Sequence, residues 1–180
     1  VRVTEMLAER FHMDKNFLKS LNPEATFNKV GENLIVANPR QETTTPVALI
    51  IAHKGAKHLY AFDANNKMIA AFPATIGSTD TPSPKGTYQI KAVAPNPWYG
   101  YSPKNFVQGK NMKPLSLPPG PNNPVGVVWM GLSKPSYGLH GSPKPEGISR
   151  QASAGCVRLT NWDVLEVYAN IENGATVVLQ

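Results

Sequence analysis

Ten of the seventeen prolines in this 180-residue chain lie between residues 82 and 124. Together with fourteen glycines, this proline content favours a β protein rich in turns over a helical bundle. Long loops without their own periodicity often act as lids or binding loops, although they can also be Ω-type loops that pack their own side chains. The proline-rich segment is therefore expected either to wall a substrate groove or to pack its own aromatic residues: Trp98, Tyr99, Tyr101 and Phe106.

Apolar runs with the composition of strands recur after residue 46, over 47–52, 58–62, 68–72 and 87–90. A turn at 63–66 joins the second run to the third, so this region is predicted to form a meander of antiparallel strands. Later strands are predicted over 125–132, 137–140, 157–159 and 175–179. Before the last strand, a helix is predicted that Asn161 caps and Gly174 closes, with one apolar face: Val164, Leu165, Tyr168 and Ile171.

The first forty residues have a helical pattern instead. Thr4 is predicted to cap one helix, and Asp14 to cap a second that ends at Asn22-Pro23. A short strand is predicted over 33–37, and the polar stretch 40–46 is interpreted as a linker. The chain is thus divided into 1–39, 40–46 and 47–180. A segment under forty residues rarely buries enough surface to be stable alone, so a helical hairpin packed on the main domain is the alternative.

Composition excludes several classes of function. The net charge of +6 suits an anionic polymer, but without a dense Lys/Arg run or a basic stripe interleaved with aromatics no nucleic-acid partner is expected. No run of 18 apolar residues predicts a transmembrane helix, and a single cysteine excludes an internal disulfide. His53 and His58 lack a third ligand nearby, so no metal site is expected, and His12 is interpreted as a surface or interface residue.

The only cysteine, Cys156, lies sixteen residues after His140, in the run Ser153-Ala154-Gly155-Cys156-Val157-Arg158-Leu159. Gly155 allows a close backbone approach to a substrate, and the amides of Gly155 and Cys156 could face a developing oxyanion. His140 could accept the thiol proton to give a thiolate–imidazolium pair. The alternative is that the lone cysteine is a small buried hydrophobe.

These residues carry a resemblance to the L,D-transpeptidases, the YkuD family of cell-wall enzymes. Residues 47–180 resemble that catalytic domain over its whole length, including a strand end at Gly77 and the turn Pro84-Lys85-Gly86-Thr87-Tyr88. The resemblance implies a mainly β fold: a YkuD-type β-sandwich of antiparallel or mixed sheets, with a long Pro-rich loop and one helix near the C-terminus. It also implies an L,D-transpeptidase that needs no cofactor, with Cys156 as nucleophile and His140 as general base.

Roles are also expected for the residues near Cys156 and His140. Many family members have His or Lys where this chain has Ala154, a change that bears on how the oxyanion region is polarised but leaves His140 as the base. The carbonyl of Gly141 is expected to orient the imidazole. Arg158, Ser153 and Gly141 are the candidate substrate-binding residues. Arg158 either binds a substrate carboxylate through a bidentate contact or braces the loop, and Ser153 is interpreted as structural rather than as a proton carrier.

By the same resemblance, the donor substrate is the tetrapeptide stem of peptidoglycan, cut before its terminal D-Ala through a thioester. The acceptor is another stem's amine, a lipoprotein lysine, a free D-amino acid or water. The alternatives are a hydrolase on the same acyl-enzyme, an L,D-carboxypeptidase or amidase, and a non-catalytic wall-binding module.

Residues 1–39 resemble a LysM-type peptidoglycan-binding module, which implies a glycan partner. The opening strand of such a module would lie around Val1 or be missing. The family resemblance further implies an exported protein of the periplasm or cell envelope, active in cell-wall biogenesis and cell shape, whose signal peptide is not in this chain.

Overall fold

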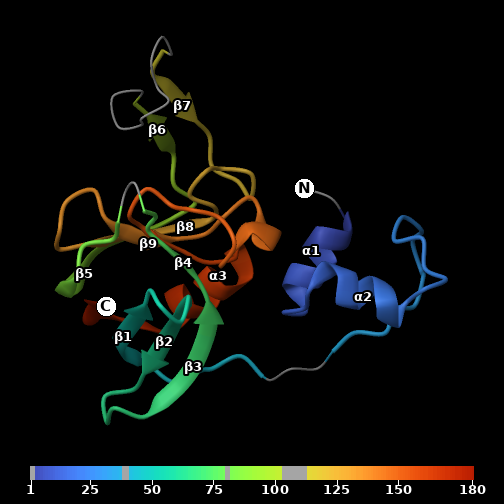
Figure 1. Cartoon of the computed structure of the whole chain (residues 1–180), viewed down its shortest axis with the longest axis horizontal. Helices are drawn as coiled ribbons and strands as arrows, with labels where there is room; N and C mark the ends of the chain where they lie inside the picture. The colour runs from blue at the N-terminus through green and yellow to red at the C-terminus, as the bar shows by residue number, and fades with distance from the viewer. Residues whose placement is uncertain (1–2, 38–40, 80–81, 103–112) are drawn as a thin grey trace.

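The computed structural model describes residues 3–37, 41–79, 82–102 and 113–180, which form a β-rich body with two helices beside it (Figure 1). The helices are α1 (Val3–Arg10), α2 (Lys15–Leu21), the 3-10 helix η2 (Pro145–Gly147) and α3 (Asn161–Asn170). The strands are β1 (Val47–His53), β2 (His58–Phe62), β3 (Met68–Pro73), β4 (Thr75–Ile76), β5 (Gly86–Pro95), β6 (Tyr99–Tyr101), β7 (Leu115–Leu117), β8 (Val128–Leu132), β9 (Gly138–His140), β10 (Val157–Arg158) and β11 (Ile171–Leu179).

Nine of these strands form one mixed sheet in the order β3-β2-β1-β11-β5-β8-β9-β10-β4. The predicted meander is confirmed for β1, β2 and β3, which pair antiparallel in sequence order. It is wrong for the fourth run, because β5 pairs with β11 and β8 and not with β3. Two pairs are parallel, β1 with β11 and β9 with β10, so the sheet is mixed.

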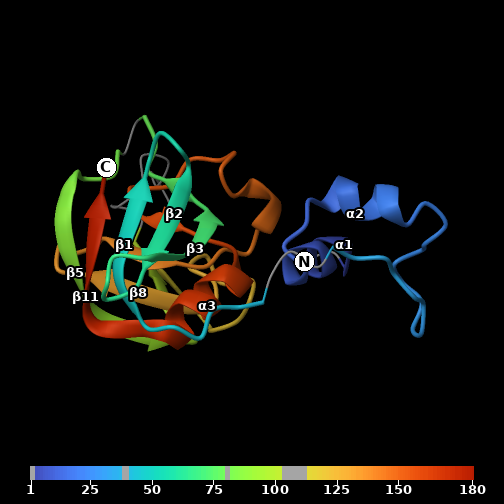
Figure 2. The ribbon, with the colours of Figure 1, turned by 90° about the horizontal axis from the view of Figure 1, so that it is seen from below.

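Strand β5 joins the two halves of this sheet. Its first residues, Gly86 to Gln89, pair with β11, and its later residues, Ile90 to Pro95, pair with β8. The register shifts between Ile90 and Ala92, and such irregularities bend a strand. Figure 2 shows β5 curving around the edge of the body. The mainly β class is confirmed, but the layers expected of a sandwich are parts of one continuous sheet.

A single apolar cluster lies inside the sheet and against α3. Fully buried members of this cluster come from several strands and from α3, for example Ile50, Leu59, Met130, Leu139 and Val164. Burying such side chains gives about 1.5–3 kcal/mol each before the entropy of ordering is subtracted. The body therefore has the apolar interior that its strand patterns predicted.

Helix α3 begins and ends at other residues than predicted. Thr160, not Asn161, is the N-cap: its backbone is extended and its Oγ1 accepts the N–H of Asp163 at 3.1 Å. The helix ends at Asn170 instead of reaching Gly174, because Ile171 already pairs with Val47 in the sheet. Gly174 lies within β11 with a φ of +70°.

The N-terminal segment contains α1 and α2. Asp14 is confirmed as the cap of α2, since its carboxylate accepts the N–H groups of Asn16 at 2.8 Å and Phe17 at 3.0 Å. Thr4 is not a cap, because α1 already begins at Val3. An opening strand was expected around Val1 or not at all; residues 1–2 lie outside the described residues, and α1 occupies the chain from Val3.

The strand predicted over 33–37 is also wrong. The side chain of Asn22, the C-cap residue of α2, accepts the N–H of Ile35 at 2.6 Å and donates to its carbonyl at 2.8 Å. The amide thus occupies the backbone groups that a neighbouring strand would have paired. Within 3–37 there are two helices and no strand.

Strands β6 and β7 of the proline-rich segment pair antiparallel and project from the body in Figure 1, and this pair is called the proline-rich hairpin. Phe106, one of the aromatic residues predicted to wall a groove or pack within this segment, lies outside the described residues. Of the helices within the described ranges, none has both the length and the apolar character needed to cross a bilayer.

Candidate active site

Strand register brings the two principal candidate residues to one face of the sheet. In the parallel pair of β9 and β10, Leu139 lies opposite Val157, and His140 lies opposite Arg158. Side chains alternate along a strand, and residues opposite one another point to the same face. Leu139 and Val157 are buried in the core. His140, Arg158 and Cys156, which directly precedes β10, therefore share the other face.

His140 is buried and held on two sides. Its Nδ1 lies 2.6 Å from the carbonyl oxygen of Gly141, and its ring stacks on Trp129 with 5.7 Å between centroids. A carbonyl can only accept, so Nδ1 carries the proton and Nε2 is left as the basic nitrogen. Burial lowers the pKa of His140 to about 4, and the Arg158 guanidinium acts in the same direction, against the hydrogen bond to Gly141. The imidazole is therefore neutral near pH 7.

Cys156 is partly buried beside β9. Its Sγ lies 3.8 Å from the carbonyl oxygen of Ser136, and the thiolate form would accept the N–H of Gly138. Burial raises the pKa of the thiol, while the Gly138 amide and the Arg158 charge lower it by less. Both pKa shifts favour the neutral thiol and imidazole at rest. This differs from the expected thiolate–imidazolium pair, because partial burial disfavours both charges.

The turn before Cys156 requires glycine. Gly155 has a φ of +97°, and a Cβ there would come within 2.7 Å of the Tyr137 ring. Its carbonyl accepts the Ser83 hydroxyl at 2.6 Å. The turn is thus held from the loop that follows β4, and this close approach is why the position tolerates no side chain.

Ser153 closes the same turn. Its Oγ donates to the carbonyl of Cys156 at 2.7 Å, and its N–H donates to the carbonyl of Gly77 at 3.1 Å. Gly77 in turn donates to the carbonyl of Cys156 at 3.4 Å. These contacts fit the structural interpretation of Ser153. Ala154 is exposed.

Arg158 presents an unsatisfied donor. Its Nε is buried, and within the described part of the chain it has no hydrogen-bond partner. Burial lowers the pKa of the guanidinium, which a charge on Cys156 or on Tyr99 would raise. Buried donors are normally paired, so this fork is suited to an anionic group of a ligand.

The proline-rich hairpin contributes Tyr99 to the site. Burial raises the pKa of this phenol, and Tyr101, Cys156 and Arg158 are the charged or ionisable groups close enough to shift it. The predicted aromatic wall is therefore represented by Tyr99, whereas Trp98 is exposed. The sequence analysis did not identify Trp129 as a site residue. Its position in the apolar run 125–132, directly before the strand that ends at His140, could have indicated a contact between the two residues.

The remaining histidines lie elsewhere. His53 and His58 pair across the β1–β2 hairpin, and each ring contacts Ala56 through Nδ1. No group of three potential ligands that could hold a metal ion occurs among the described residues. His12 lies at an interface, with its Nδ1 3.0 Å from Asp163 Oδ1.

Comparisons with known proteins show the family to which the chain belongs. The model of the L,D-transpeptidase catalytic domain family, YkuD, matches residues 48–179. A putative L,D-transpeptidase YkuD of Bacillus licheniformis is 28% identical over 176 residues, which cover 96% of this chain and 90% of that protein. A probable L,D-transpeptidase ErfK/SrfK of Escherichia coli is 27% identical over 183 residues, which cover 96% of this chain and 57% of that protein.

Solved structures share the fold at low sequence identity. An L,D-transpeptidase from Mycobacterium smegmatis superposes with a TM-score of 0.59 at 16% identity, over 73% of this chain and 58% of that one. L,D-transpeptidase 3 from Mycobacterium tuberculosis superposes with a TM-score of 0.58 at 15% identity, over 75% of this chain and 61% of that one. This chain thus covers less than two thirds of those structures.

Proposed function

Because the chain belongs to the L,D-transpeptidase family, YkuD, we propose that it is a peptidoglycan L,D-transpeptidase that works through a thioester on Cys156. The proposal is supported by the register of β9 and β10, in which His140 lies opposite Arg158, and by the position of Cys156, directly before β10 and two residues from Arg158. The stem peptide of peptidoglycan is the proposed donor, and the site of action is the cell envelope.

The first half-reaction forms the thioester. As Cys156 Sγ attacks the donor carbonyl, its proton moves to Nε2 of His140, and the carbonyl electrons move to the oxygen. Amides of Gly155 and Cys156 are proposed to stabilise that oxyanion; removing one such donor costs about 3 kcal/mol in comparable sites. Collapse expels the terminal D-Ala, whose amine takes the proton from His140.

The second half-reaction returns the thiol. The acceptor amine gives a proton to His140 and attacks the thioester carbonyl, and Cys156 leaves with that proton. A stem amine or a lipoprotein lysine fits this step. Because His140 is neutral near pH 7, it can serve as base in both steps, and the Gly141 carbonyl keeps Nε2 as the accepting nitrogen.

Arg158 is proposed to bind a carboxylate of the stem peptide. Its buried Nε lacks a partner among the described residues, and it lies on the same face as Cys156. A bidentate contact would satisfy that donor and fix the donor peptide beside the sulfur. Ser153 and Gly141 are proposed to shape the turn and to orient the imidazole, respectively.

The N-terminal segment, residues 1–39, is proposed to bind glycan in the manner of a LysM module, joined through 40–46 to the catalytic domain 47–180. The support is its sequence resemblance together with the two helices α1 and α2. An exported protein of the periplasm or cell envelope with a role in cell shape fits this substrate.

Two measurements test the proposal. Intact mass after treatment with a carbapenem should show one covalent adduct on the wild type and none on Cys156→Ala. His140→Ala should slow adduct formation by about 10²–10⁴-fold. The matched control is His58→Ala, which removes an imidazole from the β1–β2 hairpin and should leave the rate unchanged.

Muropeptide analysis after incubation with sacculi separates the possible activities. New cross-linked dimers support transpeptidation. Shortened stems would show that water resolves the thioester, and the assignment would change to a hydrolase. Unchanged muropeptides without any carbapenem adduct would leave a non-catalytic wall-binding module and refute the proposal.

A further inference from the structure

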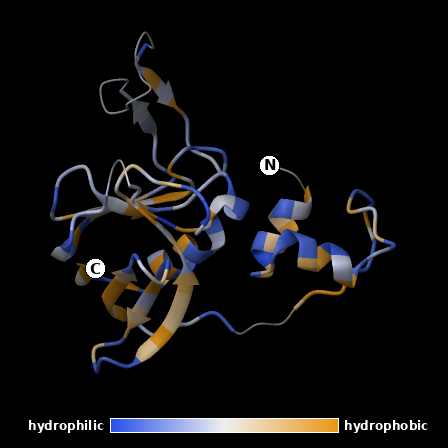
Figure 3. Ribbon diagram, viewed as in Figure 1, coloured by the Kyte–Doolittle hydropathy of each residue, from blue (hydrophilic) through white to orange (hydrophobic). Residues whose placement is uncertain are grey.

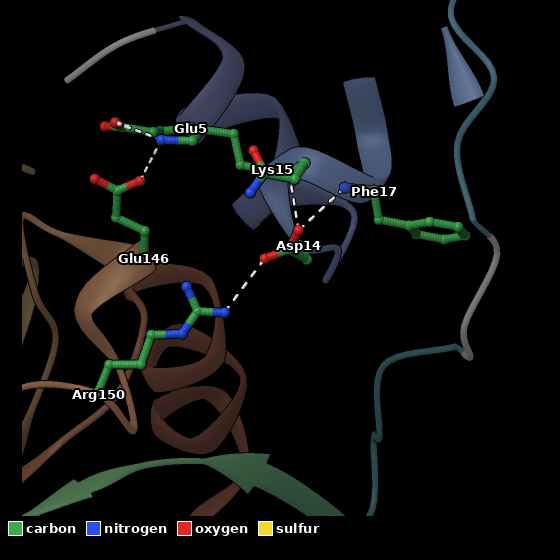
Figure 4. A network of polar contacts seen from close by, with 7 residues as sticks. Glu5, Asp14, Lys15, Phe17, Glu146 and Arg150 are labelled. Carbon is green, nitrogen blue, oxygen red and sulfur yellow. Dashed lines mark hydrogen bonds and ion pairs between the residues drawn. The ribbon is translucent and has the colours of Figure 1, made fainter. Parts of the chain in front are cut away.

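The N-terminal helices contact the segment that links the two candidate catalytic residues. Lys15 at the start of α2 pairs with Glu146, and Asp14 pairs with Arg150 at 3.4 Å (Figure 4). Glu146 lies in η2, and both Glu146 and Arg150 belong to the connection between His140 and Cys156. These ion pairs are partly exposed, so each contributes at most about 1 kcal/mol.

A more buried contact is made by Glu9 of α1. Its Oε1 accepts the N–H of Asn161 at 2.7 Å and the N–H of Trp162 at 3.3 Å. These are the first two N–H groups of α3, and Thr160 takes the third, that of Asp163. Helix N-termini leave such donors without intrahelical partners and favour a negative charge. Glu9 thus completes the cap of α3 from a different part of the chain.

Asn161 connects this cap to the site. Its Oδ1 accepts the N–H of Val127 at 3.2 Å, and its Nδ2 donates to the carbonyl of Pro121 at 3.2 Å. The same Oδ1 lies so close to Gly141 that a Cβ there would come within 2.2 Å of it. Gly141 is the residue whose carbonyl holds His140 Nδ1. A contiguous set of contacts therefore runs from Glu9 through Asn161 and Gly141 to the imidazole.

The N-terminal helices α1 and α2 and the body do not share a continuous apolar core among the described residues. A cleft of 390 Å³ lies between the N-terminal helices and the body, lined by Met13 on one side and by Phe72 and Pro73 on the other. Polar contacts at its border, including His12 with Asp163, hold the helices in place. Changing one of these contacts can therefore alter the docking without unfolding the body.

We propose that Glu9 is a positioning residue for His140, which it orients through the start of α3, Asn161 and Gly141. The N-terminal segment then acts on the transpeptidase site in addition to any role in glycan binding. This inference rests on the proposed function, because the effect expected of Glu9 is a change in the rate at which Cys156 is acylated.

The test compares three variants of the full chain in carbapenem acylation. Glu9→Ala removes the acceptor and should lower the first-order acylation rate by about 10-fold, since small misplacements of a base are costly, while the apparent carbapenem affinity changes little. Glu9→Gln keeps an oxygen that can accept the same two N–H groups and should recover most of the rate. Glu24→Ala, an exposed glutamate of the same segment, is the matched control.

The pH profile adds a readout that a merely structural role would not move. If His140 loses its orientation and gains access to water, the acid limb of the acylation profile of Glu9→Ala should move up from about pH 4 toward the ordinary histidine value of 6.5. A wild-type rate and profile in Glu9→Ala would overturn the inference. So would a Glu9→Gln variant as slow as Glu9→Ala. Absence of any adduct on the wild type would instead refute the proposed function.

Discussion

The body and the N-terminal helices are held together by different forces. The body buries a cluster of aliphatic side chains from most of its strands, and Figure 3 shows apolar residues along β1 and β3. Among residues 3–37, the buried apolar side chains are Ala8 and Leu18, while Met6, Phe17 and Val30 are exposed. Hydrogen bonds and ion pairs to the body take the place of a core.

Because the body is held by apolar burial and the N-terminal helices by polar contacts, the contacts of the helices can be altered without disturbing the body. Apolar burial is cooperative, because every side chain removed leaves a cavity that its neighbours line. Exposed ion pairs are worth little individually and depend on salt. The body should therefore unfold as one unit that tolerates changes in α1 and α2, whereas those helices should depend on the body.

The largest expected effect comes from a pair of matched core substitutions. Leu139→Ala should lower the free energy of unfolding of the body by about 2–5 kcal/mol, because Leu139 is fully buried. Leu18→Ala removes an equally buried leucine from α2 and should leave the body within about 0.5 kcal/mol of the wild type. Urea denaturation followed by tryptophan fluorescence is measured in a Trp162→Phe background, because Trp162 contacts Arg10 and Glu9 of α1, whereas Trp129 lies in β8 of the body. Equal losses in both variants would mean that the two regions share one core.

Acid should act on the body through His140. Its folded pKa of about 4 lies below the ordinary value of 6.5, so its contribution to stability is present above pH 6.5 and is lost as the pH falls toward 4. The loss is on the order of 3 kcal/mol. Unfolding measured at pH 7, 5.5 and 4 should show it, and His140→Asn should flatten that dependence. An unchanged slope in His140→Asn would contradict the assignment, and His58→Asn serves as the control.

A smaller effect is expected from the cap of α2. Asp14→Ala removes both the cap and the contact to Arg150 and should destabilise α2 by about 1 kcal/mol. Asp14→Asn keeps a capping oxygen and should lose much less. Hydrogen exchange of the Asn16 and Phe17 amides measures the difference. Full protection of both amides in Asp14→Ala would show that packing, not the cap, holds α2.

The smallest effect is expected from the exposed ion pair itself. Arg150→Ala should change the stability by no more than about 0.5 kcal/mol, because both side chains are substantially exposed. A double-mutant cycle with Asp14→Asn measures the coupling between the two charges. Coupling well above 1 kcal/mol would mean that this single ion pair is a main element of docking, and that α1 and α2 are not held by several individually weak contacts.

Local patterns predicted the local features well. The bounds of β2, the turn after it and the Asp14 cap follow from residues that are neighbours in sequence. Predictions failed where a distant partner intervened. Ile35 forms no strand because the Asn22 amide takes its backbone groups, and α3 stops early because Ile171 pairs with Val47.

The sequence by itself determined the β class of the body, the family and the identity of the candidate residues, because motif spacing and strand periodicity are local properties. Only the tertiary structure decided that β9 and β10 lie side by side, that Trp129 stacks on His140, and that Glu9 caps α3. These contacts join residues far apart in the chain. Their formation depends on which surfaces can be buried together, and no local pattern records that choice.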